Sequence, residues 1–170
     1  MRFWTFWRRT VFSLALFLAL LQPAPAQQRA GEVDALATGG AAWFTDGPRH
    51  SVFGGSVRFH LSDRFAVEPE FLHMGTSQAH HDQVFVASVV YHFTKESRMA
   101  PFVMGGVGAF RQTFGQDAGR FSTTDVDGLF GTGLRVNLTN RIFVEPRLRI
   151  GVQDLYIVLT GSIGFALTGR

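Results

Sequence analysis

The sequence predicts an all-β protein, an eight-stranded antiparallel up-and-down transmembrane β-barrel, on three observations. Apolar and polar residues alternate with period two over most of the chain, and no segment after residue 26 carries a helical stripe. Eight alternating segments are each about the 9–11 residues that a tilted strand needs to cross a bilayer. Tight turns join the strands at one end and mostly longer polar loops join them at the other, as in barrels that cross a membrane.

The expected strands cover residues 32–44, 52–61, 65–74, 84–93, 101–111, 126–138, 142–150 and 155–167. Only residues 62–64 separate the second strand from the third, and only 139–141 separate the sixth from the seventh. The connection at 94–100, on the same side, is longer. We expect the function to lie in the polar connections on the other side, at 45–51, 75–83 and 112–125.

The first 26 residues have the features of a secretory signal peptide. Three arginines precede an apolar run at 11–21, and Ala24-Pro25-Ala26 is a small-x-small cleavage site. The apolar run is shorter than the roughly 20 residues of a membrane-spanning helix. We therefore expect residues 1–26 to be removed and one barrel domain to occupy residues 27–170.

Charge and cysteine usage exclude several classes of function. Three of the sixteen basic residues and none of the thirteen acidic ones lie in the signal segment, so the remaining chain carries no formal net charge. The high isoelectric point is therefore no sign of a nucleic-acid partner. Cysteine is absent, so the exported fold has neither disulfides nor thiolate metal sites. We expect no cofactor.

One hairpin is present twice in the chain. FGGSVRFHLSDRFAVEPEF at 53–71 recurs as FGTGLRVNLTNRIFVEPRL at 130–148, with a constant offset of 77 and eight of nineteen positions identical. The two copies are strands two and three and strands six and seven. In a closed eight-stranded barrel these hairpins lie on opposite walls.

Counting back from each turn predicts buried ion pairs. With 62–64 as the loop, Arg58 lies directly opposite Glu68, and the same count sets Arg135 opposite Glu145. These residues share the polar face of each hairpin. Inside a narrow barrel both charges lose water, so each needs the other.

The next polar position differs between the two copies. Glu70 in the first hairpin corresponds to Arg147 in the second, and we hypothesise that the two side chains reach toward one another across the lumen. Arg149 lies on the same face. Eight strands leave an interior only just wide enough for side chains, so this Arg/Glu set predicts a closed pore.

Alternation alone does not say which face meets water. A soluble lipocalin-like or avidin-like ligand-binding barrel would put the apolar face inside, whereas a transmembrane barrel puts it outside. The transmembrane arrangement is favoured by a bulky apolar face (Phe85, Val89, Tyr91, Phe93), by a small polar face on the last strand (Thr160, Ser162, Gly164, Ala166) and by aromatic residues near strand ends that would form interfacial girdles (Trp43, Phe44, Tyr91, Phe93, Phe102, Phe110).

The chain resembles the OmpA/OmpX-type small outer-membrane β-barrels. The resemblance rests on the signal peptide, eight alternating strands, the tight turns LSDR and LTNR, the glycine-rich run PFVMGGVGAF and the inward Glu/Arg set. It implies the outer membrane of a Gram-negative cell, termini in the periplasm, insertion by the assembly machinery and a lumen filled by polar side chains. Expected partners are outer-membrane lipid, lipopolysaccharide and an extracellular ligand at the loops.

Histidines raise two alternatives. His80, His81 and Asp82 lie together in a loop, but their spacing matches no standard metal-ligand set, so we expect an exposed polar loop. The chain is similar in size to the lipid A deacylases and acyltransferases, which are barrel enzymes, and resemblance to the deacylase would imply a His–Ser pair. His73 with Ser77, or His50 with Ser51, are the candidates, and neither has an evident acidic partner. We therefore expect no enzymatic activity.

The two prolines at the centre of the repeat, Pro69 and Pro146, disturb regular pairing. Proline removes a donor from the ladder, and a closed barrel has no free edge. The sequence therefore predicts a bulge or a missing hydrogen bond at both positions.

Overall fold

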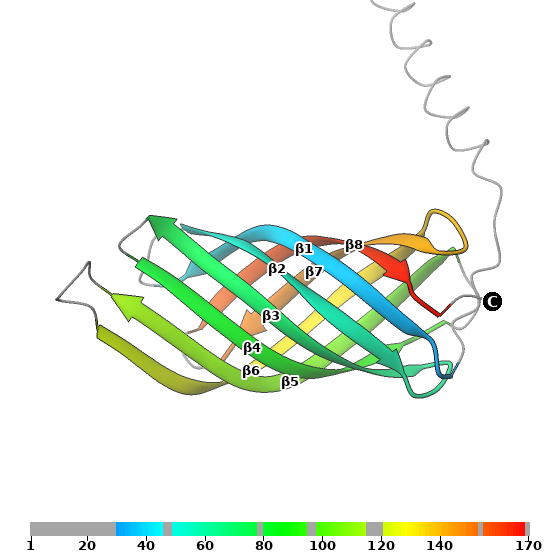
Figure 1. The fold of residues 1–170 in the computed structure, drawn as a ribbon, viewed down its shortest axis with the longest axis horizontal. Coiled ribbons are helices and arrows are strands. Elements are labelled where there is room, and N and C mark those ends of the chain that lie inside the picture. Colours follow the sequence, from blue (N-terminus) through cyan, green and yellow to red (C-terminus); the bar gives the residue numbers. More distant parts are fainter. Residues whose placement is uncertain are drawn as a thin grey trace, which may run out of the picture.

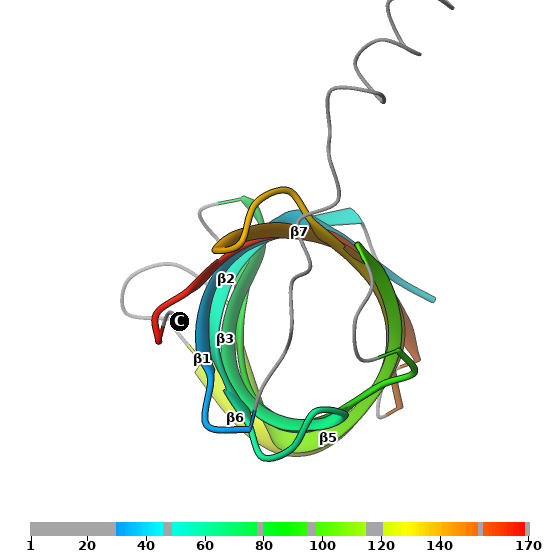
Figure 2. The same cartoon turned by 90° about the vertical axis from the view of Figure 1, so that its right-hand side faces the viewer.

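The protein is a closed barrel of eight antiparallel strands, in which each strand pairs with its neighbour in the chain and the last pairs with the first (Figures 1 and 2). A computed structural model describes residues 30–45, 49–77, 80–94, 98–114, 121–152 and 155–168. The strands are β1 (Val33–Phe44), β2 (Arg49–His60), β3 (Phe65–Ser77), β4 (His80–His92), β5 (Met99–Phe114), β6 (Phe121–Asn137), β7 (Ile142–Gly151) and β8 (Tyr156–Ala166). The predicted fold class is confirmed. Within the described ranges no helix is long and apolar enough to cross a membrane.

The strands extend further into the expected loops than the side-chain pattern indicates. β2 begins at Arg49, β4 at His80 and β6 at Phe121, while β5 continues to Phe114. The expected boundaries were wrong here because backbone N–H and C=O groups continue to pair after the apolar alternation ends. Residues 46–48, 78–79 and 115–120 of these connections, and the expected signal segment 1–26, lie outside the described residues.

The duplicated hairpin forms two matching turns. Leu61 N donates to Phe65 O and Leu138 N donates to Ile142 O, both at 2.9 Å. In each turn a hydroxyl accepts from the first residue of the following strand, at 3.0 Å for Ser62 Oγ and 2.9 Å for Thr139 Oγ1. We call this end of the barrel, where β1 begins and β8 ends, the turn end, and the opposite end the loop end.

The outer face is apolar and the lumen holds the charged side chains. On β3, Phe65 and Phe71 are exposed while Glu68 and Glu70 are buried. The same alternation continues around the barrel, with exposed residues that include Phe53, Phe85, Val107, Phe130, Leu148 and Ile163. A water-soluble barrel would show the opposite arrangement, so the inverted faces indicate a barrel surrounded by lipid.

Three aromatic residues expected in an outer girdle lie in the lumen instead. Phe102 and Phe110 are 0% and 3% exposed, and Phe44 stacks on Tyr156 with ring centroids 4.9 Å apart. Phe102 is paired across the strands with Gly133, where an added Cβ would lie 2.4 Å from its ring. Gly133 allows the Phe102 ring to lie against the barrel wall, and the sequence pattern did not reveal this.

The family resemblance implied a lumen filled by polar side chains, but only part of the lumen is polar. Its loop-end half contains an apolar cluster of Ala42, Val52, Leu72, Met74, Val84, Val86, Phe110, Leu129, Tyr156 and Val158. A smaller cluster near the turn end contains Ala66, Val90, Phe102 and Met104. The expectation was wrong in this half because inward positions there carry branched and aromatic side chains that fill the narrow interior by packing.

Both prolines interrupt the strand ladder without shifting its register. The β2–β3 pairing runs through Ser56–Glu70 and resumes at Phe59–Val67, and the β6–β7 pairing runs through Gly133–Arg147 and resumes at Val136–Val144. The gaps fall at Pro69 and Pro146, whose ring nitrogens cannot donate. The predicted missing hydrogen bond is confirmed at both sites, and neither site has a bulge.

Two glycines of β8 provide a test of lumen packing. At Gly164 an added Cβ would lie 2.1 Å from Phe143 Cζ, whereas at Gly161 nothing lies within 4 Å. We expect Gly164→Ala to lower the free energy of unfolding by about 1–3 kcal/mol, because the buried Phe143 ring must move. Gly161→Ala, the matched control, leaves it unchanged or raises it. Urea unfolding in lipid vesicles measures both, and equal values would contradict the packing.

Candidate functional site: the ion network of the lumen

Eight of the charged residues buried in the lumen lie close together and come from five strands. The repeated hairpins supply Arg58, Glu68, Glu70, Arg135, Glu145, Arg147 and Arg149, and β1 adds Asp34; all eight are buried. They lie between the turn end and the apolar cluster of the loop-end half. We call these eight residues the lumen network.

Four of these residues form a closed ring of alternating charge. Arg58 Nε donates to Glu68 Oε2 at 2.6 Å, and both terminal nitrogens of Arg58 donate to the Glu145 carboxylate at 2.8 Å. Arg147 completes the ring, with Nη1 donating to Glu68 Oε1 at 2.6 Å and Nη2 to Glu145 Oε2 at 2.7 Å. Each carboxylate is therefore held by two guanidinium groups, and the ring joins one repeated hairpin to the other across the lumen.

Glu70 lies beside this ring and binds Arg149. Both terminal nitrogens of Arg149 donate to the Glu70 carboxylate, Nη2 to Oε1 at 2.9 Å. Glu70 and Arg147 were expected to meet, and Arg147 Nη1 does lie 3.6 Å from Glu70 Oε1. The hypothesis identified a real contact but not the main partner of either residue, because Arg149 reaches Glu70 with two parallel hydrogen bonds.

Arg135 makes its hydrogen bond to a residue other than Glu145, which the register count placed opposite it. Arg135 Nη1 lies 4.0 Å from Glu145 Oε1, whereas the same nitrogen donates to Asp34 Oδ2 at 2.7 Å. The guanidinium lies over the Phe143 ring, 3.5 Å from its centroid. The predicted Arg135–Glu145 ion pair is present, but it is not hydrogen-bonded, because Glu145 is already bound by Arg58 and Arg147 and Arg135 donates instead to Asp34 on β1.

Asp34 is the network residue that sequence reasoning missed. It accepts from Arg135 and lies 2.8 Å from His60 Nε2. Alternation along β1 places it on the lumen face, and the β1–β2 register sets it directly opposite Arg58. The signal was present in the alternation. The counts from the two tight turns did not include β1, so no partner was assigned to Asp34.

The lumen network is electrically balanced, with four guanidinium groups facing four carboxylates. Charges removed from water are strongly unfavourable unless paired, so the balance is a condition for burying all eight. Two phenylalanines support the guanidiniums. Arg58 and Arg147 lie 5.3 and 5.9 Å from the Phe102 centroid, and Arg135 lies over Phe143.

The residues His80, His81 and Asp82 were the candidate metal ligands, and only the side chain of Asp82 is among the described residues. Asp82 is buried on the lumen side of β4, with His50 Nδ1 3.5 Å from its Oδ2. His80 and His81 belong to β4 rather than to a loop, and their side chains lie outside the described residues. Among the residues that are described, no group of three or more His, Asp or Glu side chains is placed to hold a metal ion.

Neither His–Ser candidate is assembled by the described residues. His50 is buried in the lumen, whereas the adjacent Ser51 points outward and donates to Gly75 O at 2.9 Å. His73 packs against Phe53 with the two rings tilted, their centroids 4.7 Å apart. The side chain of Ser77 lies outside the described residues. Successive strand residues point to opposite faces, so His50 and Ser51 do not share a face.

A closed eight-stranded barrel with an apolar exterior and an ion-paired interior is a small transmembrane β-barrel. The family described as "Outer membrane protein beta-barrel domain" matches residues 12–161. The chain therefore belongs to the outer-membrane β-barrel proteins, and the resemblance found in the sequence is confirmed.

Solved structures with the same fold include three bacterial proteins. The N-terminal β-barrel domain of Pseudomonas aeruginosa OprF is 19% identical with a TM-score of 0.65, covering 82% of this chain and 100% of that one. Neisserial surface protein A is 15% identical with a TM-score of 0.66, covering 79% and 95%. Ail, the attachment invasion locus protein of Yersinia pestis, is 14% identical with a TM-score of 0.52, again covering 79% and 95%. No curated protein matches the sequence.

The Glu70–Arg149 pair allows a double-mutant test of the lumen network. Glu70→Leu or Arg149→Leu alone leaves a buried charge, and each is expected to lower the free energy of unfolding by about 3–5 kcal/mol. The double variant should cost less than the sum of the two by about 1–3 kcal/mol. Urea unfolding in vesicles measures the cycle. Arg64→Leu, at an exposed arginine of the turn end, is the control, and additive single effects would contradict the pairing.

Proposed function

We propose that this protein is an integral outer-membrane barrel with a structural or loop-mediated interaction role, a lumen closed by the lumen network, and no enzymatic activity. The closed ring of Arg58, Glu68, Arg147 and Glu145 is the observation that carries the proposal. It extends across the interior between opposite walls. In a barrel of eight strands, side chains of this size leave no continuous aqueous path.

The lumen network serves architecture rather than chemistry in this proposal. Its carboxylates are each bound by guanidinium groups, and an acid or base in that state has no free proton to exchange with a substrate. His50 and Ser51 point to opposite faces of β2, so this His–Ser candidate does not form a catalytic pair. These points support a non-enzymatic barrel over a lipid A-modifying enzyme, and the inverted faces argue against a soluble ligand-binding barrel.

The proposal includes an export route and contacts with the outer membrane. Residues 1–26 act as the signal peptide, the outer-membrane assembly machinery inserts the mature chain, and lipopolysaccharide and lipid surround it. The loop end faces the exterior, where a ligand would bind. Two proteins of the same fold are described as a surface protein and an attachment invasion locus protein, which supports a role at the cell surface.

Single-cysteine labelling tests the orientation, because the native chain has no cysteine. Ser122, at the loop end, and Asn140, in a tight turn, are both exposed. We expect a membrane-impermeant maleimide to label Ser122→Cys in intact cells and to label Asn140→Cys only after the outer membrane is opened. The reverse pattern would contradict the proposed orientation, and labelling of both in intact cells would argue against membrane insertion.

Planar-bilayer recording tests the closed lumen. The purified, heat-modifiable barrel is expected to show no stable conductance steps, because the lumen network and the apolar cluster fill the interior. Reproducible open-pore steps from folded protein would overturn the proposal of a closed barrel.

Lipid A analysis tests the absence of enzymatic activity. The lipid A of cells with and without the protein should show no difference in acylation.

A further inference from the structure

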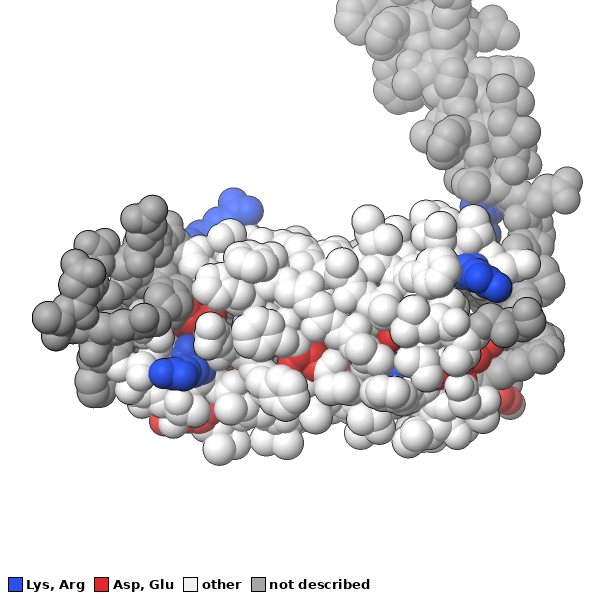
Figure 3. Space-filling view, viewed as in Figure 1, with Lys and Arg blue, Asp and Glu red and all other residues white. Residues whose placement is uncertain are grey.

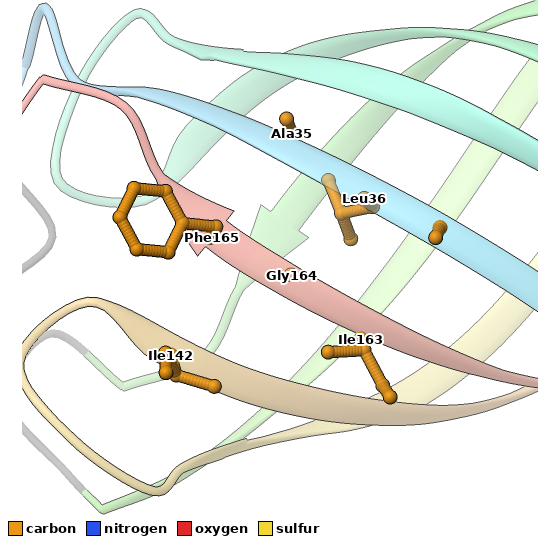
Figure 4. A pocket seen from close by; sticks show the side chains of 7 residues that line it. Ala35, Leu36, Ile142, Ile163, Gly164 and Phe165 are labelled. Atoms are coloured by element: carbon orange, nitrogen blue, oxygen red, sulfur yellow. The ribbon is translucent and has the colours of Figure 1, made fainter.

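The outer face contains an apolar groove where β7, β8 and β1 run side by side. The groove has a volume of ≈ 430 Å³ and is lined by Ala35, Leu36, Ala37, Ile142, Ile163, Gly164 and Phe165 (Figure 4). Ala35 is paired with Phe165 and Ala37 with Ile163. The small side chains of β1 therefore form the floor, and the larger side chains of β8 and β7 form a wall.

The shallow floor continues along β1 beyond this groove. Alternation gives Ala35, Ala37, Gly39 and Ala41 the outward direction on β1; Ala41 is covered by its neighbours to 5% exposure, and Trp43 follows. Gly39 is paired with Gly161, at which an added Cβ would meet nothing within 4 Å. From Ala35 to Ala41 the strand covers about 20 Å. With a strand tilt of about 45°, this corresponds to roughly half the thickness of a bilayer core of about 30 Å, or one leaflet.

The surroundings determine what can occupy this groove. It lies among the exposed apolar side chains of the outer face, and the side of the barrel that Figure 3 shows is mostly uncharged between the basic residues near its two ends. Hydrocarbon fits there without loss of hydrogen bonds, and a flexible chain gains dispersion contacts with both the floor and the wall.

An exposed arginine, Arg141, is next to the groove in the chain, at the turn end. Arg141 directly precedes the groove residue Ile142, and its carbonyl accepts from Ala166 N at 2.8 Å, which fixes it between the ends of β7 and β8. The Arg141 side chain is exposed. At the turn end, a guanidinium in this position lies at the level of lipid headgroups, where a phosphate is its natural partner.

We propose that this groove binds one anionic phospholipid of the leaflet at the turn end, with an acyl chain along β1 and the phosphate at Arg141. The inference rests on the membrane-spanning placement of the proposed function. It goes further because it assigns a defined lipid position to one seam of the barrel. The apolar groove and the exposed Arg141 next to it in the chain together match a lipid with a negative headgroup.

Native mass spectrometry of the folded barrel tests the proposal. The protein is extracted into mild detergent from vesicles of phosphatidylglycerol and phosphatidylcholine with identical acyl chains. The wild type is expected to retain one phosphatidylglycerol. Ala37→Phe fills the groove and should lower retention about tenfold, because it displaces buried methylenes. Arg141→Gln should lower the preference for phosphatidylglycerol over phosphatidylcholine about fivefold.

Two matched controls come from the same chain. Ala87 lies on the outer face of β4, away from the groove, so Ala87→Phe should leave retention unchanged. Arg64 holds the equivalent place in the other copy of the hairpin, so Arg64→Gln should leave the headgroup preference unchanged. Heat-modifiable mobility shows that each variant is folded in the membrane, which separates failure of this proposal from failure of the proposed function.

Three results would overturn the proposal. They are equal lipid retention by the wild type and Ala37→Phe, retention without headgroup preference, and a lipid-free wild-type dimer that Ala37→Phe dissociates. The last would make the groove an interface between copies.

Discussion

The pairing of buried charges in the lumen is the constraint on which this barrel depends. Arg58, Arg147, Glu68 and Glu145 have no access to water, so each stays charged only while its partners hold position. Those partners belong to opposite walls, β2 and β3 on one side and β7 on the other. A slip of one residue in any of these strands would turn a charge toward lipid. The ion pairs therefore specify register and closure together.

Glycine and aromatic residues make room for this arrangement. Phe102 lies opposite Gly133 and Phe143 lies opposite Gly164, so each ring occupies space that a side chain would otherwise take. The guanidiniums then pack on those rings. Toward the loop end, the apolar cluster fills the interior without charge. The outer face follows the opposite rule. There the small residues of β1 leave a groove between larger neighbours, and the surrounding lipid, rather than the protein, supplies what fills it.

Much of the fold was predictable because its rules are local. Period-two alternation located all eight strands, and the duplicated hairpin located two turns and the Arg58–Glu68 pair. Errors arose where the answer depended on more distant residues. Near the loops the strands are longer than expected, because backbone pairing continues past the apolar pattern. Phe102 and Phe110 were assigned to the wrong face because position near a strand end was used in place of register.

The choice of partners inside the lumen shows where local information ends. Turn geometry and alternation place Arg135, Glu145, Glu70 and Arg147 on the lumen face from the chain alone, because both depend only on neighbouring residues. Which charges meet depends on the curvature of the closed sheet, and this curvature brings Arg58 to Glu145, Arg149 to Glu70 and Asp34 to Arg135. These contacts join residues far apart in sequence, so they exist only once the barrel closes. The physical reason is that a strand specifies the direction of each side chain, whereas the distance to the opposite wall is a property of the whole barrel.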